Sequence, residues 1–126
     1  EGILAESERV YQFQRVFNLR LGFGTREYDI PPYRAVGPVT AKEYDSRAER
    51  YDRQLREEVG VEPDGLTTLE KMALIRRYRL ERYDRLVDAV YKRRGWTENG
   101  VPTVETLQRN GIDFPDLVAL VQRHGG

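Results

Sequence analysis

The side chains that most often carry catalysis are scarce in this chain. Its 126 residues include no cysteine and a single histidine, His124, which is followed only by two glycines. The sequence therefore offers no thiolate nucleophile and no cysteine ligand for a metal or an iron–sulfur cluster, and it argues against a histidine-based triad. We expect His124 to be a mobile terminal residue. We predict no catalytic, cofactor-binding or metal-binding residue in this chain.

Paired carboxylates can perform acid–base catalysis. Two such pairs are Glu57 with Glu58 and Asp45 with Glu49, and both lie in charge-rich stretches with arginines nearby. Because oppositely charged neighbours are typical of a solvated helix face, that interpretation explains the pairs better than an active site does.

A basic stretch in the third predicted helix reads R-R-Y-R-L-E-R-Y-D-R. It has two interpretations: a solvated helix face, or a surface whose arginines and tyrosines bind nucleic acid or an acidic partner. Lys plus Arg equals Asp plus Glu, at 21 each. A polyanion binder normally carries a net basic charge, so we predict no nucleic-acid partner.

The loop from Gly22 to Pro32 is the best functional candidate. It places Arg26 and Asp29 on either side of Tyr28 and ends in a Pro-Pro pair. A phosphate-binding loop is disfavoured, because the string G-x-x-x-x-G-K-[ST] is missing. We expect an Arg–Asp pair to hold the loop or to dock it on a neighbouring domain. The residues predicted for this docking loop are Arg20, Gly22, Phe23, Arg26, Tyr28, Asp29 and Pro32.

Apolar residues at helical spacing predict the element that precedes this loop. The spacing indicates a helix from about residue 3 to residue 20, ended by the glycines at 22 and 24. The residues that line one face of this helix are Ile3, Val10, Phe13, Phe17 and Leu21.

Capping signals predict the remaining helices. The S/T-x-x-E capping box of Thr40 opens a helix that ends at Gly60, and that of Thr67 opens a helix that runs to about residue 94. Two short helices are predicted at 104–109, with Thr103 as N-cap, and at 114–122, capped by Asp113. No segment alternates like a strand. The sequence thus predicts an all-α fold: a compact helical domain with three main helices, two short C-terminal helices and one long Gly/Pro loop.

Length predicts one helical domain over residues 1–126. Trp96, the single tryptophan, follows Gly95 at the end of the long helix, and we expect it to fold back and plug the core at a corner. The longest strictly apolar run, Leu117–Val121, is far shorter than the ~20 residues of a membrane helix, and no signal-peptide pattern is present. We therefore predict a cytoplasmic protein without a membrane partner. The chain begins without Met, which we interpret as a fragment or a processed piece.

Two motifs resemble the C-terminal domain of the aldehyde ferredoxin oxidoreductase family. The first matches the pattern E-R-x-x-x-x-x-R-x-F-N-x-R-x-G, followed by R-x-x-D and a proline. The second, R-G-W-T-E-N-G-V-P-T over residues 94–103, is similar to the family's R-G-W-x-x-x-G-x-P-T signature. The residues that match the first motif are Glu8, Arg9, Arg15, Phe17, Asn18, Arg20, Gly22, Arg26, Asp29 and Pro31 or Pro32.

This resemblance implies a tungsten-dependent, occasionally molybdenum-dependent, oxidoreductase with a bis-pterin (molybdopterin) cofactor and a [4Fe–4S] cluster. Such an enzyme oxidises aldehydes to carboxylic acids and passes electrons to ferredoxin. The V-Y-K-R-R-G-W string is similar to the bacterial branch that includes a benzoyl-CoA reductase subunit. Because this chain has no cysteine, it cannot hold the cluster, and we place no pterin ligand on any residue. We expect a supporting C-terminal piece of a larger enzyme that is inactive alone.

Two partners follow for such a piece: the N-terminal cofactor domains and, for the full-length enzyme, ferredoxin. A domain separated from its partners should expose an apolar patch, which would favour self-association. The candidates for that patch are Phe23, Tyr28, Ile30 and Tyr33. The alternative hypothesis is a stand-alone helical protein-interaction module without catalysis.

Overall fold

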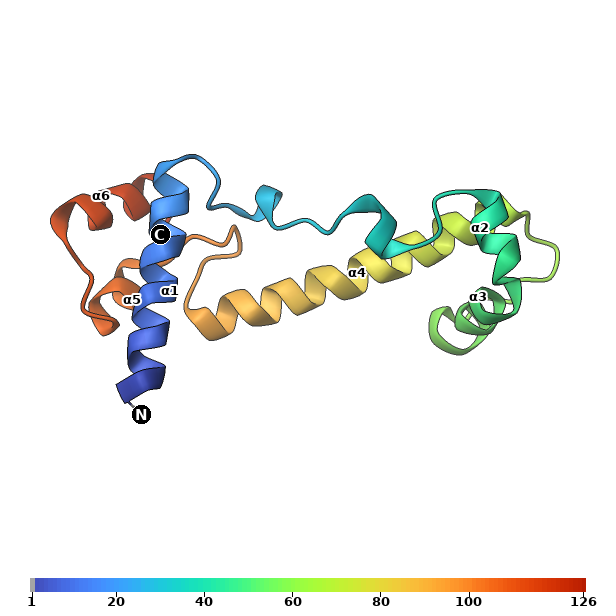
Figure 1. Cartoon of the computed structure of the whole chain (residues 1–126), viewed down its shortest axis with the longest axis horizontal. Coiled ribbons are helices and arrows are strands. Elements are labelled where there is room, and N and C mark those ends of the chain that lie inside the picture. Colours follow the sequence, from blue (N-terminus) through green and yellow to red (C-terminus); the bar gives the residue numbers. More distant parts are fainter. Residues whose placement is uncertain (1) are drawn as a thin grey trace. The chain divides into compact units, whose positions relative to one another are not determined.

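Helices make up the regular structure of the computed structural model, which describes residues 2–126. A 3-10 turn follows α1 and another precedes α2, and a π-helical turn continues α3 (Figure 1). The described residues contain no strand, so the predicted all-α fold is confirmed. The helices are α1 (Gly2–Arg20), α2 (Ala41–Ser46), α3 (Ala48–Gln54), α4 (Thr68–Arg94), α5 (Val104–Arg109) and α6 (Pro115–Arg123). The other turns are Arg26–Tyr28, Tyr33–Val36 and the π-helical Leu55–Val59.

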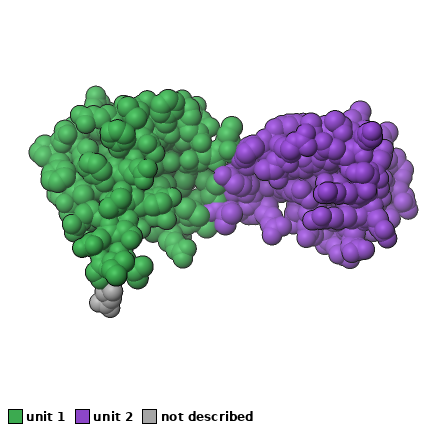
Figure 2. Space-filling model, in the orientation of Figure 1, with its two compact units in different colours: residues 1–30, 87–126 green, residues 31–86 purple. Residues whose placement is uncertain are grey.

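The chain divides into two compact units (Figure 2). Unit 1 comprises residues 1–30 and 87–126, and unit 2 comprises residues 31–86. The first part of α4 belongs to unit 2 and its last turns belong to unit 1. That residues 1–126 make a single domain of a larger enzyme stays a prediction.

Unit 1 is built around a cluster of aliphatic side chains from α1, α5, α6 and the segments between them. Helix α1 packs against α6, and α5 also packs against α6. Helix α1 contributes two members, Val16 and Leu19, which are 0% and 2% exposed. The cluster comprises Val16, Leu19, Val101, Leu107, Ile112, Leu117, Leu120 and Val121.

The apolar face predicted for α1 points to solvent rather than into this core. Its members Ile3, Val10 and Leu21 are between 57% and 79% exposed, and Phe13 and Phe17 are about half exposed. The core-facing side instead carries Gln12 and Arg15 beside the two aliphatic residues. At about 100° per residue the two sets fall on roughly opposite faces of the helix. Helix α1 therefore has two packing faces, one of which is uncovered.

Unit 2 has a smaller core formed by Tyr44, Leu55 and Ile75. The second predicted helix is interrupted in this unit: α2 ends at Ser46, and Arg47, at φ −133° and ψ 30°, separates it from α3. A single continuous helix over residues 40–59 was therefore wrong. Gly60, at φ 79°, ends the π-helical turn at the predicted position.

Most predicted caps are present. The Thr67 hydroxyl accepts from the Glu70 N–H at 3.2 Å and the Glu70 carboxylate accepts from the Thr67 N–H, also at 3.2 Å, so this capping box is complete. Thr103 caps α5 as predicted. The prediction of Asp113 as the cap of α6 was wrong: the N-cap position is occupied by Phe114, because Pro115 begins the helix.

Candidate functional site

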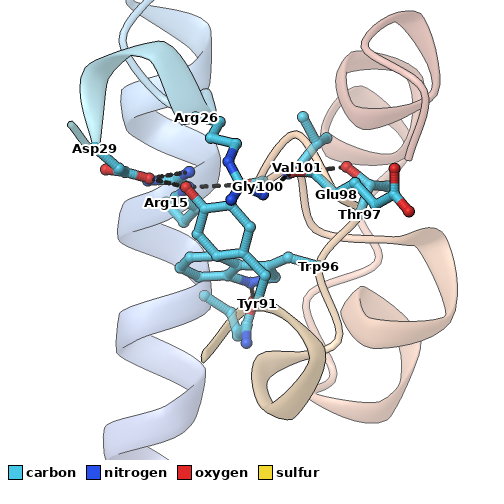
Figure 3. A network of polar contacts seen from close by, with 10 residues as sticks. Arg15, Arg26, Asp29, Tyr91, Trp96, Thr97, Glu98, Gly100 and Val101 are labelled. Carbon is cyan, nitrogen blue, oxygen red and sulfur yellow. Dashed lines mark hydrogen bonds and ion pairs between the residues drawn. The ribbon is translucent and has the colours of Figure 1, made fainter. Parts of the chain in front are cut away.

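A buried arginine lies at the centre of the polar contacts in unit 1 (Figure 3). Arg15 on α1 is 9% exposed. Its guanidinium donates to both carboxylate oxygens of Asp29, at 3.2 and 2.8 Å, and its Nε donates to the Gly100 carbonyl at 2.8 Å. The guanidinium carbon lies 4.5 Å from the centre of the Trp96 ring and 5.6 Å from that of Tyr91. A buried arginine is tolerated when it is paired and hydrogen-bonded in this way.

Asp29 is bound from two sides, because the Tyr91 hydroxyl also donates to its carboxylate. Burial alone would raise the pKa of Asp29, but the hydrogen bonds from Arg15 and Tyr91 and the charge of Arg15 lower it below its ordinary value. Burial, followed by the hydrogen bond to Asp29 and its negative charge, raises the pKa of Tyr91 to about 12. At neutral pH the carboxylate is charged and the phenol is neutral. Neither group is therefore tuned for proton transfer, and the pair suits a clamp rather than an acid–base site.

Arg26 attaches the loop to the other side of the same turn. Its backbone N–H donates to the Asn99 carbonyl at 2.9 Å, and its guanidinium donates to the Glu98 carbonyl at 3.0 Å. The guanidinium also forms an ion pair with Asp88 on α4, at 2.6 Å. The loop is thus joined to α1 through Asp29 and to residues 97–101 through Arg26.

The turn from Thr97 to Val101 presents its carbonyls to the two arginines. The Thr97 N–H donates to the Val101 carbonyl and the Gly100 N–H donates to the Thr97 carbonyl, both at 2.8 Å. Gly100 has φ 77°, and a Cβ built there would lie 2.8 Å from Cζ of Tyr91. A residue with a side chain would be strained in the backbone and would also collide with the clamp. This explains glycine in the T-E-N-G-V-P string.

Trp96 folds back onto α1, as predicted from its position after the long helix. Its Nε1–H donates to the Gln12 side-chain oxygen at 2.6 Å, and the Gln12 amide donates to the Arg94 carbonyl at 2.9 Å. Gln12 is fully buried, with its amide satisfied on both sides. The Trp96 ring is half-buried and stacks against Tyr11, with the ring centres 6.3 Å apart.

Gly24 explains how the loop approaches the helix so closely. A Cβ built at Gly24 would lie 2.6 Å from the Leu19 nitrogen and 2.9 Å from the Arg15 carbonyl oxygen. Gly24 is therefore required for close approach, whereas Gly22, at φ 90°, provides the left-handed conformation that ends the helix.

The predicted docking-loop residues take different positions. Arg26 and Asp29 face the clamp, whereas Arg20 and Gly22 are exposed. Phe23 and Tyr28 are 57% and 51% exposed, and their rings pack edge to face with centres 5.3 Å apart. Pro32 is exposed and belongs to unit 2. The expected Arg–Asp pair exists with Arg15, a residue that the sequence motif contained but that was not among the predicted docking residues.

The patch candidates Phe23, Tyr28, Ile30 and Tyr33 are each more than half exposed. Phe23, Tyr28 and Ile30 belong to unit 1, and Tyr33 belongs to unit 2, where the Arg76 guanidinium lies 3.4 Å from its ring centre.

A small pocket of about 320 Å³ lies beside the loop in unit 1. His124, expected to be a mobile terminal residue, lines it together with Glu27 and Asn99. The lining carries one carboxylate and one imidazole, fewer than a metal ion requires.

The residues present do not fit the metal cofactors that the resemblance implies. A [4Fe–4S] cluster is held by cysteine thiolates, and the sequence has none. Across residues 2–126, no group of three or more His, Cys, Asp or Glu side chains is arranged to hold a metal ion. Within the same range, no helix combines the length and the apolar composition needed to cross a membrane.

Comparison with known proteins gives one match. The model of a family described as aldehyde ferredoxin oxidoreductase, domains 2 and 3, matches residues 1–112. No curated protein and no solved structure gave a match. The matched region contains α1, the loop, the clamp and the turn that receives both arginines. With most of its length matched, including both sequence motifs, this chain belongs to the aldehyde ferredoxin oxidoreductase family.

Proposed function

We propose that this chain is a supporting C-terminal domain of a tungsten-dependent enzyme that oxidises aldehydes and passes electrons to ferredoxin. In this proposal the tungsten bis-pterin and the [4Fe–4S] cluster are held by other parts of the enzyme, since the residues of this chain do not fit them. Its role is to dock on the part that holds the cofactors. Membership of the benzoyl-CoA reductase-like branch stays a prediction.

The uncovered face of α1 carries this proposal. Its large apolar side chains are 47% to 79% exposed, although the opposite face of the same helix is packed in the core. An exposed apolar stripe of this kind marks a surface that another protein part covers. The family description numbers the matched region as domains 2 and 3, so the occupant that we propose is domain 1 of the same enzyme.

The docking loop is the second part of the proposed surface. Arg26 and Asp29 bind inward and fix the loop, and this leaves Phe23 and Tyr28 projecting outward. Because the clamp holds the backbone before docking, little conformational entropy would be lost when these rings bind. In this scheme Arg26 and Asp29 position the loop, whereas the two rings make the contact.

The test replaces Phe13 and Phe17 together by serine in the full-length enzyme. We expect tungsten and iron per protein, measured by elemental analysis, to fall several-fold, because domain 1 would no longer be held over α1. The unfolding free energy of the isolated chain should change by less than about 0.5 kcal/mol for each site, since both side chains are already wet there.

The control is Leu69→Ser, which removes an apolar side chain that is 69% exposed on α4 in unit 2. It should leave the metal content unchanged. Normal metal content and activity in the Phe13/Phe17 double variant would refute docking through α1, as would an equal loss in the Leu69 variant.

A further inference from the structure

Unit 2 contains a pocket of about 500 Å³ whose wall is rich in arginine. Its volume lies within the range of small-molecule sites, roughly 300–1,000 Å³. Four guanidinium groups line it, together with one carboxylate and one phenol ring. These residues are Arg34, Arg47, Arg50, Arg79, Glu43 and Tyr51.

The carboxylate in the wall is already engaged. Glu43 accepts from Arg34 at 2.9 Å and from the Val39 backbone N–H at 3.1 Å, so it neutralises one arginine and completes a local turn. Hydrogen bonding to the Val39 N–H, followed by that to Arg34, lowers the pKa of Glu43, which is therefore ionised at neutral pH.

The other three arginines have no anionic partner in the wall. Arg79 donates to the neutral Gln54 side chain at 2.9 Å and lies 5.6 Å from the centre of the Tyr51 ring. Neither Arg47 nor Arg50 forms an ion pair with any of residues 2–126. Like charges gathered without counter-ions repel one another, and a bound anion would remove this repulsion.

We propose that this pocket binds a small phosphorylated molecule with a diphosphate-like charge. Guanidinium groups match phosphate oxygens with paired N–H donors, and several of them on one wall can share an anion of charge −2 or −3. A carboxylic acid would neutralise only one arginine. A long polyanion such as RNA is disfavoured, because the chain as a whole has no net charge and the cations are confined to a concave site. This inference rests on unit 2 and is independent of the docking role proposed for α1.

Inorganic pyrophosphate is the probe, titrated into the whole chain by calorimetry. We expect saturable binding of one pyrophosphate per chain. Arg47→Gln and Arg50→Gln should each weaken it about tenfold, the typical effect of losing a charge-assisted hydrogen bond. Both side chains are exposed, and circular dichroism checks that the variants keep their helices. The matched control is Arg53→Gln, an exposed arginine on the same helix as Arg50 but outside the pocket, which should bind like the unmodified chain.

Citrate separates phosphate recognition from simple charge attraction, because it carries about the same charge on carboxylates. We expect it to bind at least about tenfold more weakly than pyrophosphate. Equal affinity for citrate would overturn the assignment of a phosphate ligand. The proposal would also fail if pyrophosphate showed no saturable binding below ~10 mM, or if Arg53→Gln weakened binding as much as the pocket variants.

Discussion

Replacing Asp29 by asparagine tests whether the clamp holds unit 1 together. The substitution leaves the Arg15 guanidinium buried without its charged partner, and the Arg15 and Asp29 side chains are 10% and 30% exposed. Removing one partner of a fully buried ion pair costs about 3–5 kcal/mol. Asp29 keeps some contact with water, and Arg15 retains the Gly100 carbonyl and two aromatic rings, so we expect a loss of about 2 kcal/mol.

The assay is urea unfolding followed by the fluorescence of Trp96, which is the single tryptophan and contacts the clamp directly. The matched control makes the same chemical change at Asp88, whose side chain is 61% exposed in its ion pair with Arg26. Exposed ion pairs contribute little, so Asp88→Asn should cost less than about 0.5 kcal/mol. If the two variants lost equal stability, the clamp would not be a major source of the stability of unit 1.

The pH dependence gives an independent check on the same variant. The folded-state pKa of Asp29 lies below its ordinary value of 3.8, so its contribution is present above about pH 4 and is lost as the pH falls through the lower, folded-state pKa. The difference in stability between the unmodified chain and Asp29→Asn should therefore shrink below pH 4. A difference that stayed constant down to pH 2 would contradict the assignment of the stabilisation to the ionised carboxylate.

Two further changes probe the rest of the clamp. Tyr91→Phe removes the hydroxyl that binds Asp29 and should cost about 1 kcal/mol. Because the pKa of Tyr91 rises from 10.0 to about 12 in the folded state, its contribution is full below pH 10 and declines toward pH 12; this variant should show a flatter loss of stability across that range, and an unchanged alkaline profile by Trp96 fluorescence would refute the assignment. Gly100→Ala should destabilise unit 1 by more than about 2 kcal/mol, because the positive φ and the contact with Tyr91 act together, whereas Gly125→Ala, at φ 90° with open space around it, should cost about 1 kcal/mol or less; equal thermal shifts in the two variants would show that the contact with Tyr91 is unimportant.

The local sequence determined where most helices begin and end. The capping box of Thr67, the cap at Thr103 and the stop at Gly60 depend on groups within a few residues of each other, so a short window contains the whole interaction. The interruption at Arg47 and the cap of α6 escaped this reasoning. In the second case, proline fixed the start of the helix one residue later than the acidic side chain suggested.

The candidate site was partly contained in the sequence. The two motifs drew attention to both segments that meet at the clamp, and the lack of cysteine excluded an iron–sulfur cluster from this chain. The partners inside the clamp could not be predicted, because Arg15 binds a carboxylate 14 residues away and a carbonyl 85 residues away. The spacing of charged residues along a chain does not specify such pairs.

By itself, the sequence determined an all-α chain, the positions of most helix ends and a family resemblance, because each depends on local order or on a motif. Only the tertiary structure decided which face of α1 is buried. Periodicity reveals an apolar stripe but not what covers it, and in this fold Gln12 and Arg15 lie inward because their hydrogen-bonding partners come from distant segments. The stripe that periodicity did reveal remains exposed to solvent.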